Sequence, residues 1–212
     1  MEKLNRLIPT GEPLEKLKRY CELVQKWQKT INLIGPTTVS DIWQRHVLDS
    51  YQLMDVAPSW QNWLDLGSGG GFPGLVVAIA GAGDANRSVH LVESDRRKVA
   101  FLREVSRETG TPVEIHPSRI EELVPKLSIE IDFQVVSARA LAPLDKLLEY
   151  SGDVIRQGAV GLFLKGKGVH RELTSLEVGA NFEIQLLNSS VDSEGKIVVV
   201  RSHNQLRPSL GV

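Results

Sequence analysis

A glycine-rich stretch, WLDLGSGGGFPG at residues 63–74, carries the clearest chemical signal in the chain. It places five glycines within eight positions, directly after a short apolar run. Glycine weakens regular structure, so a cluster of this kind indicates that a ligand or another segment comes close to the backbone. A dinucleotide, a phosphate, an adenosyl sulfonium and a plain tight turn are all compatible with this stretch taken alone.

Two carboxylates narrow the choice of ligand. Asp65 forms the pattern D-x-G-x-G-x-G with Gly67, Gly69 and Gly71, and it suits a positively charged ligand better than a pyrophosphate, which it would repel. Bracing of the loop by hydrogen bonds to glycine N–H groups is an equally open role for Asp65. Glu93 ends the next apolar run, 26 positions after Gly67. At that place in a nucleotide-binding α/β fold, an acid accepts hydrogen bonds from ribose hydroxyls.

A second glycine stretch, GLFLKGKG at residues 161–168, nearly matches a phosphate-binding P-loop. Gly168 stands where a serine or threonine should hold magnesium, and Gly161 lies inside an apolar run instead of after it. We therefore reject the P-loop interpretation.

The elements that must position these residues alternate between strands and helices. Apolar patterns predict strands at 63–66, 88–93, 112–116, 131–137 and 159–164 and helices at 73–82, 95–109, 141–156 and 169–180. This alternation predicts a mostly parallel sheet. Two further runs, 182–188 and 196–202, have only a polar turn between them and are expected to form an antiparallel hairpin at a sheet edge. The predicted class is α/β, with seven strands.

The first quarter of the chain shows no strand pattern. Apolar residues spaced by three or four predict a helix over 13–34, Gly35-Pro36 would end it, and a second helix would run through about Asp55. We expect a helical extension at residues 1–58, a sheet domain at 59–206 and a loose tail at 207–212.

The composition is that of an ordinary globular domain: 212 residues, 42% hydrophobic and 24% charged. Because the formal net charge is −1, any contact with nucleic acid must rest on a local basic patch. A single cysteine, Cys21, and histidines without metal-ligand spacing predict no disulfide and no metal. With no evident signal sequence or membrane-spanning run, we expect a cytoplasmic protein.

The order and wording of the motifs resemble those of the bacterial small-subunit rRNA guanine-N7 methyltransferases, the glucose-inhibited division protein B family. The matching stretches run from about residue 27 to 168 and are INLIGPTTVSDIWQRHVLDS, WLDLGSGGGFPG, HLVESDRRKVAFLREV, PSRIEEL, VVSARALAPL and FLKGK. The combination of RH-x-x-DS with the glycine loop is specific, whereas a methyltransferase loop alone would not be.

The resemblance implies a Rossmann-like methyltransferase sheet with S-adenosylmethionine as methyl donor. It also implies N7 of a guanine as acceptor, at nucleotide 527 in the 530 loop of 16S rRNA, with the rRNA or the 30S subunit as partner. Carried over by position, Gly67 and Phe72 would contact the donor, and Ile120 and Glu121 would lie by the adenine. Arg139 would close the site.

Guanine N7 is also the acceptor that the residue types suit best. N7 carries a free lone pair and no proton, so its methylation needs positioning and no general base. Methylation of cytosine at carbon-5 would need a nucleophilic cysteine, and Cys21 lies on the apolar face of the first predicted helix. Amino-group methylation often goes with an Asn/Asp-Pro-Pro-aromatic motif, which SARALAPL at 137–144 lacks.

Basic residues near the carboxyl ends of the predicted strands are candidates for contacting the RNA. Arg139 and Lys165 lie at such ends, and Arg45 and His46 lie on the second predicted helix. His46 and Asp49, three residues apart, suit either a simple helix pair or a substrate contact.

Rival functions stay open on the sequence. The same donor site would serve a methyltransferase acting on another RNA, a protein or a small molecule, because the glycine loop does not encode the acceptor. A nicotinamide-dependent oxidoreductase shares the G-x-G-x-x-G spacing but is disfavoured by Asp65 and by the closing hairpin. A non-catalytic ribosome-binding module is disfavoured by the intact glycines and Glu93.

Overall fold

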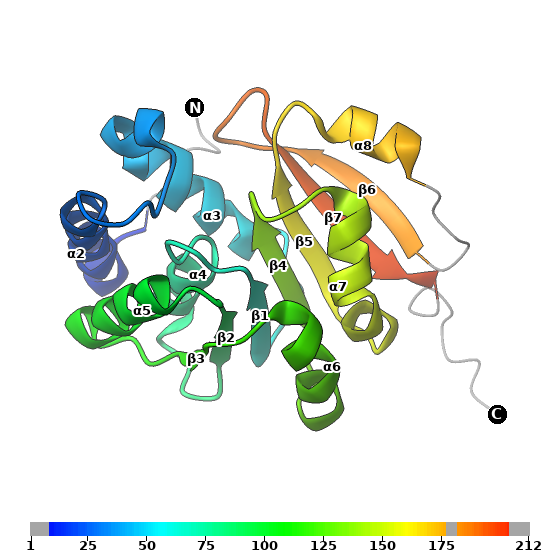
Figure 1. Cartoon of the computed structure of the whole chain (residues 1–212), viewed down its shortest axis with the longest axis horizontal. Coiled ribbons are helices and arrows are strands. Elements are labelled where there is room, and N and C mark those ends of the chain that lie inside the picture. Colours follow the sequence, from blue (N-terminus) through cyan, green and yellow to red (C-terminus); the bar gives the residue numbers. More distant parts are fainter. Residues whose placement is uncertain (1–8, 177–181, 204–212) are drawn as a thin grey trace.

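A seven-stranded sheet forms the centre of the molecule in a computed structural model, which describes residues 9–176 and 182–203 (Figure 1). The strands are β1 Asn62–Leu66, β2 Ser88–Val92, β3 Glu114–His116, β4 Val135–Arg139, β5 Val160–Lys165, β6 Phe182–Asn188 and β7 Lys196–Ser202. Their order across the sheet is β3-β2-β1-β4-β5-β7-β6. Strands β1 to β5 run parallel, and β6 and β7 form the antiparallel edge hairpin that the sequence predicts.

The strand order turns around at β1, and this fixes where a ligand can bind. β1 pairs with β2 on one side and with β4 on the other. Open α/β sheets bind ligands outside the carboxyl ends of the strands at such a point. The glycine loop follows Leu66 at the end of β1, and Glu93 follows Val92 at the end of β2. The fold therefore brings both predicted signals to one crevice.

Helices cover both faces of the sheet (Figure 1). They are α2 Gly11–Trp27, α3 Asp49–Tyr51, α4 Gly74–Gly81, α5 Arg96–Thr109, α6 Ile120–Glu130, α7 Leu144–Arg156 and α8 Val169–Ser175. Successive strand residues alternate between two cores, so Trp63 packs with α2, α4 and α5 while Leu64 packs with α6 and α7. Each large aliphatic side chain buried in this way contributes roughly 1.5–3 kcal/mol. The two cores hold the strand ends, and hence the site loops, in place.

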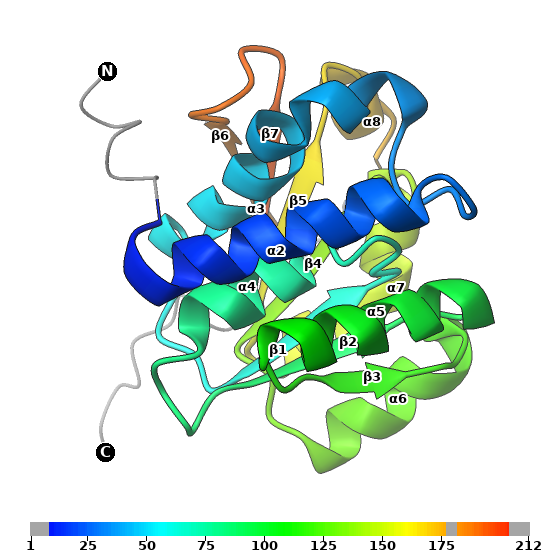
Figure 2. The same cartoon turned by 90° about the vertical axis from the view of Figure 1, so that its left-hand side faces the viewer.

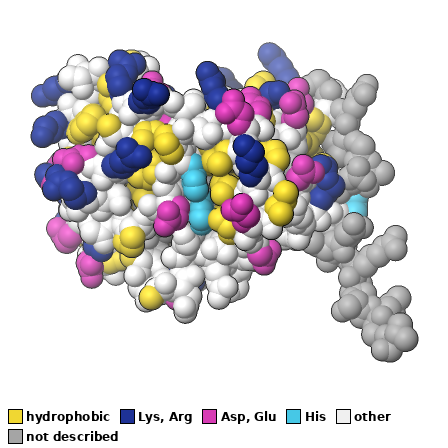
Figure 3. Space-filling model, turned by 60° about the horizontal axis from the view of Figure 1, so that its bottom comes forward, with side chains coloured by type: hydrophobic (Ala, Val, Ile, Leu, Met, Phe, Trp, Pro, Cys, Tyr) yellow, Lys and Arg dark blue, Asp and Glu magenta, His cyan; other side chains and the backbone are white. Residues whose placement is uncertain are grey.

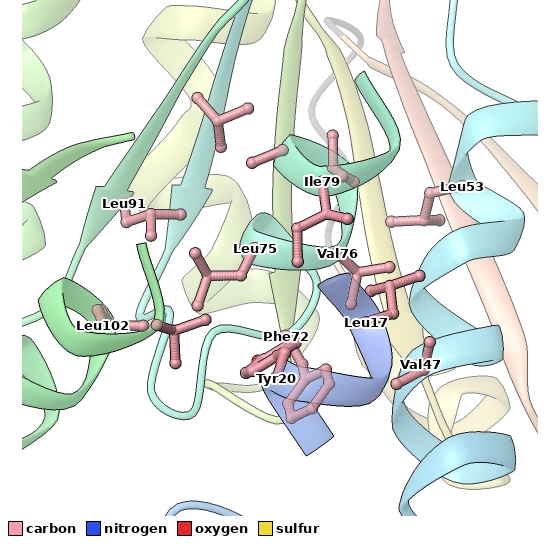
Figure 4. Close-up of a cluster of buried hydrophobic side chains, with 14 of the residues drawn as sticks. Leu17, Tyr20, Val47, Leu53, Phe72, Leu75, Val76, Ile79, Leu91 and Leu102 are labelled. Atoms are coloured by element: carbon pink, nitrogen blue, oxygen red, sulfur yellow. The ribbon is translucent and has the colours of Figure 1, made fainter. Parts of the chain in front are cut away.

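The N-terminal extension shares the core of the sheet domain. α2 crosses α4 and lies beside α5 (Figure 2), and its Leu17 and Tyr20 are fully buried. Leu17, Val47 and Leu53 of the extension meet Val76 of α4 in one hydrophobic cluster (Figure 4). The extension is thus placed to shape the glycine loop.

The extension differs from the predicted pair of long helices. α2 ends at Trp27, because the Gln28 side chain bonds to the backbone of Leu33 and Ile34 and turns the chain. The predicted second helix consists of short pieces: the 3₁₀-helix η1 Pro36–Asp41, the π-helix η2 Trp43–Leu48, α3, and the 3₁₀-helix η3 Gln52–Asp55. Apolar spacing alone does not separate these helix types. π-Helical turns occur frequently at functional sites.

Other elements also depart from the prediction. The sequence pattern does not predict α6, which contains Pro125, a residue that normally breaks helices. β4 begins at Val135 instead of residue 131, and β3 begins at Glu114 instead of residue 112. α8 ends at Ser175, and residues 177–180 of that predicted helix lie outside the described residues, as does the predicted tail at 207–212.

The outer surface carries charges of both signs. On the face shown in Figure 3, Lys and Arg side chains are interspersed with Asp and Glu. Among the described helices, none is both long enough and apolar enough to cross a membrane.

Candidate donor and acceptor cavities

The glycine loop joins β1 to α4 through three left-handed residues. Gly67, Gly69 and Gly71 have φ values of +60°, +55° and +89°, a region that residues with a Cβ rarely adopt. The Ser68 N–H donates to the Val92 carbonyl at 3.0 Å, which ties the loop to the end of β2. The backbone path itself therefore requires part of the glycine cluster.

Some of these glycines are required by core packing, and others face open space. A Cβ on Gly71 or Gly74 would lie closer than 3.0 Å to a leucine methyl of the core. A Cβ on Gly69 would meet only the Gly67 carbonyl, at 3.6 Å. Gly67 and Gly69 line a cavity, so their bare backbone is available to a ligand, whereas Gly71 is explained by the core.

Three cavities surround the carboxyl ends of the central strands. The loop cavity, of about 300 Å³, lies between residues 32–35 of the extension and the glycine loop. The Glu93 cavity, of about 270 Å³, has Glu93 and the start of α6 on its walls. The Lys165 cavity, of about 440 Å³, lies between β5, the extension and the β6–β7 turn. Ala140, which has a φ of +49°, lines all three, so they meet just beyond β4.

The loop and Glu93 cavities together form a groove, called here the donor groove. Gly67, Lys98 and Ala140 line both of its halves. Among the residues predicted to hold a ligand, those that line it are Gly67, Gly69, Phe72, Glu93, Ile120, Glu121 and Arg139. The structure thus brings together residues from the loop, from the end of β2, from α6 and from β4.

Glu93 connects the two ends of this groove. Its Oε2 accepts from the Gly69 N–H at 2.9 Å, and its Oε1 accepts from the Asp95 N–H at 2.7 Å. Glu93 is 8% exposed and lines the Glu93 cavity. Because a carboxylate has about four acceptor sites, it retains capacity for hydroxyl donors in that cavity. Glu121, beside it, accepts from the Tyr150 hydroxyl at 3.0 Å.

Asp65 lies behind the loop instead of in the groove. Its side chain is 0% exposed, and its pKa is raised to about 6 because burial outweighs the hydrogen bonds that it accepts. Oδ1 accepts from the Ser137 hydroxyl at 2.7 Å, and Oδ2 accepts from the Gly74 N–H at 3.3 Å. Of its two predicted roles, the geometry supports bracing of the loop.

A tyrosine of the extension reaches the same loop from the other side. The Tyr20 hydroxyl donates to the Gly70 carbonyl, and its ring stacks on Phe72 with centroids 5.0 Å apart (Figure 4). The Phe72 ring in turn packs against the His46 ring, with centroids 5.1 Å apart. This contact between α2 and the loop is not evident from the sequence, where Tyr20 is one more position on an amphipathic helix.

His46 lines the loop cavity with an uncharged imidazole ring. Burial, followed by the charges of Arg139 and Arg45, lowers its pKa to about 3. The Thr38 hydroxyl donates to the Gly35 carbonyl at 2.8 Å, and its oxygen lies 2.7 Å from His46 Nε2. Since that hydroxyl has one hydrogen, Nε2 must be the donor of the second bond.

The three basic residues of the Lys165 cavity all lie near carboxylates. Arg45 pairs with Asp192 at 2.9 Å, and Lys165 pairs with Glu172 at 2.7 Å. The third is Arg139, whose Nη2 lies 3.6 Å from Asp49 Oδ2 and donates to the Arg45 carbonyl. These pairs make the cavity polar without a large net charge.

Lys165 also supports the loop that follows β4. Its Nζ donates to the Ala142 carbonyl at 2.7 Å, and its side chain is 10% exposed. Glu172 also accepts from the Leu144 N–H at 2.7 Å, at the start of α7. The geometry therefore gives Lys165 a positioning role beside the cavity.

Sequence reasoning missed several parts of the site. Lys98 lines both halves of the donor groove, although the basic run at 96–98 reads as the exposed start of a helix. Residues 32–35 form a wall of the loop cavity, and Gly35-Pro36 was the available signal for a turn there. In the described ranges, no cluster of three or more His, Cys, Asp or Glu side chains is arranged to hold a metal ion.

Comparison with known proteins shows the family of this chain. The GidB family, described as rRNA small subunit methyltransferase G, matches residues 13–198. A ribosomal RNA small subunit methyltransferase G from Methylorubrum populi is 46% identical over 197 residues, covering 93% of this chain and 92% of that protein. One from Paramagnetospirillum magneticum is 48% identical over 201 residues, covering 94% of each.

A solved structure shows the same fold at low identity. A methyltransferase from Geobacter sulfurreducens aligns with a TM-score of 0.57 and 15% identity, covering 94% of this chain and 93% of that one. The match to the family and to its members over most of the sequence leads to one conclusion: the chain belongs to the rRNA small subunit methyltransferase G family.

Proposed function

We propose that this protein transfers a methyl group from S-adenosylmethionine to N7 of a guanine in 16S rRNA, nucleotide 527 of the 530 loop. The observation that carries the proposal is a donor groove that meets a second polar cavity beyond β4, in a chain of this family. Because ribosomal RNA is the substrate, we infer that the enzyme acts in the cytoplasm, on the rRNA or the 30S subunit.

The residues of the donor groove fit S-adenosylmethionine. Glu93 would hold the ribose hydroxyls, and Ile120 and Glu121 would flank the adenine at the start of α6. Gly67 and Gly69 present backbone without a Cβ to the loop cavity, which leaves room for the amino-acid end. When bound, S-adenosylmethionine supplies a methyl group made electrophilic by a positively charged sulfur.

Because no proton has to move, the task of this chain's residues is to position the two reactants. The N7 lone pair forms a bond to the methyl carbon as the carbon–sulfur bond breaks, and the bonding pair stays on sulfur. Such an in-line displacement depends on alignment in a shaped pocket. His46 stays uncharged on the cavity wall at neutral pH, since its pKa is about 3. The site has the residues that this chemistry needs.

Methylation of 30S subunits tests the proposal. Subunits from a strain lacking this enzyme are incubated with the protein and tritiated S-adenosylmethionine, and N7-methylguanine is mapped by borohydride–aniline cleavage. One labelled guanine in the 530 loop is expected. Intact donor binding with no label on 30S subunits or free 16S rRNA would reject the rRNA assignment, and label at another atom would reject N7.

Replacing Glu93 by alanine is expected to weaken S-adenosylmethionine binding by roughly 1–3 kcal/mol, because hydrogen bonds to a charged acceptor are lost. Isothermal titration calorimetry measures the change. Glu114→Ala, which removes an exposed glutamate from β3, is the matched control and should bind normally. Unchanged affinity in Glu93→Ala would mean that Glu93 only joins the loop to the start of α5.

Tyr20→Phe is expected to weaken donor binding by about 1 kcal/mol while the ring stacking on Phe72 is kept. The change leaves the buried Gly70 carbonyl without its partner. Tyr51→Phe serves as control, since the Tyr51 hydroxyl makes no hydrogen bond within the described part of the chain. Equal donor affinities for both variants would show that the extension does not act on the loop through this bond.

A further inference from the structure

The Lys165 cavity has the size and chemistry of a site for a neutral polar ring. Its volume of about 440 Å³ lies within the range of roughly 300–1,000 Å³ typical of ligand pockets. Its charged groups are balanced, since Arg45 and Lys165 each form a direct ion pair at its wall. A phosphate would find little uncompensated positive charge there, whereas a base would find both donors and acceptors.

Asp49 is a side-chain acceptor of this cavity with unused capacity. Its Oδ1 accepts from Gln52 Nε2 at 2.8 Å and from the Ser189 hydroxyl at 3.3 Å. Its Oδ2 lies 3.6 Å from Arg139 Nη2, which is beyond hydrogen-bond distance, and accepts no hydrogen bond within the described ranges. A half-buried carboxylate of this kind, whose side chain is 14% exposed, has acceptor capacity for a ligand in the cavity.

The layout of the cavities sets which edge of a guanine would meet Asp49. Arg139 and Ala140 line both the loop cavity and the Lys165 cavity, so a methyl group leaving the donor groove reaches the acceptor there. N7 of the target guanine must face that junction. N1–H and the 2-amino group lie on the other side of the ring, and both are donors. That side then faces the interior of the Lys165 cavity, where Asp49 lies.

We propose that Asp49 reads the target base by accepting hydrogen bonds from guanine N1–H and the 2-amino group. This inference rests on the proposed function and adds to it the residue that selects guanine. Adenine would place an unprotonated N1 against the carboxylate and has no 2-amino group. A site built to receive donors rejects a ring that lacks them far more strongly than an apolar pocket rejects a change of size.

The variant Asp49→Asn separates base reading from structural support. Asparagine keeps the Oδ1 acceptor for Gln52 and Ser189. It replaces Oδ2, which lies 3.6 Å from Arg139 Nη2, with an NH₂ group that would oppose guanine N1–H. We expect kcat/KM for rRNA to fall about 10- to 100-fold, with donor affinity and Tm unchanged. Asp41→Asn removes an exposed carboxylate from the same segment and is the control.

A second arm uses inosine in place of the target guanine, in rRNA assembled from ligated pieces, because inosine lacks only the 2-amino group. The wild type should methylate the inosine RNA about 10-fold more slowly than the guanosine RNA. Asp49→Asn should show a much smaller preference for guanosine. Comparing the preferences of the two enzymes also corrects for any difference in intrinsic reactivity between the two bases. The wild-type comparison requires no variant to fold. A full preference in Asp49→Asn, no preference in the wild type, or a normal rate in Asp49→Asn would each overturn the assignment. If the wild type methylated neither RNA, the proposed function itself would fail.

Discussion

Gly67→Arg is expected to abolish S-adenosylmethionine binding, with an affinity loss above about 100-fold, because the new side chain would occupy the donor groove. Gly67 lines both halves of that groove. A Cβ at this position would lie 2.5 Å from a Leu141 methyl, and the φ of +60° disfavours any side chain. Fluorescence or calorimetric titration with the donor measures the loss directly.

The loss at Gly67 has to be separated from unfolding. Leu141 meets the new Cβ with the end of a flexible side chain, so the cost to folding is mainly the left-handed backbone, roughly 1–2 kcal/mol. For a chain of this size that corresponds to a fall in Tm of about 2–8 °C. Gly83→Arg adds the same charge where nothing lies within 4 Å of the new Cβ and should bind normally. A folded Gly67→Arg protein with normal affinity would mean that the donor groove is misplaced.

The fold class was predictable because its signals are local. Seven short apolar runs, most of them separated by helical patterns, predict the sheet that forms, and the absence of a helix between the last two runs predicts the hairpin. α6 was not predicted, because Pro125 interrupts an otherwise ordinary helical spacing of Ile120, Val124 and Leu127. The division of the second N-terminal helix into short pieces was not predicted, because tertiary contacts, and not apolar spacing, decide between α, π and 3₁₀ turns.

The site was predictable where one strand end carries several signals. The glycines, Glu93 and Ile120–Glu121 follow strands in sequence, so their meeting at the groove follows from the parallel sheet. Tyr20 and Asp49 belong to helices whose docking depends on long-range packing. No spacing in the sequence places the Tyr20 hydroxyl against a loop carbonyl fifty residues away. The contribution of the extension to the site therefore required the structure.

A chain of hydrogen bonds with fixed directions holds the glycine loop from behind. Trp63 Nε1 donates to the Ser137 hydroxyl at 2.8 Å, and that hydroxyl donates to Asp65 Oδ1 at 2.7 Å. The Gly74 N–H donates to Asp65 Oδ2. The Ser137 hydroxyl and the Gly74 N–H are both donors, so each oxygen of the Asp65 side chain has to be an acceptor. The chain joins β1, β4 and the first turn of α4, the elements that flank the donor groove.

Asp65→Asn is expected to remove a large pH dependence from the free energy of unfolding. The Asp65 pKa of about 6 in the folded chain lies above the ordinary value of 3.8, so between these values the folded state holds the proton more tightly. Protonation therefore favours folding, and the stabilisation grows as pH falls from 7 to 4 and is lost as pH rises. The difference of roughly two pKa units corresponds to about 3 kcal/mol.

Urea unfolding of the wild type and Asp65→Asn at pH 7, 6, 5 and 4 measures this contribution. The wild type should gain stability relative to the variant as the pH is lowered, whereas Asp41→Asn, which alters an exposed carboxylate, should follow the wild type. Asparagine cannot accept on both sides, because its NH₂ group must face either the Gly74 N–H or the Ser137 hydroxyl. If the curves of the wild type and Asp65→Asn ran parallel, Asp65 would carry no raised pKa. The loop would then be held by the backbone conformation of its glycines and by the Tyr20 contact instead.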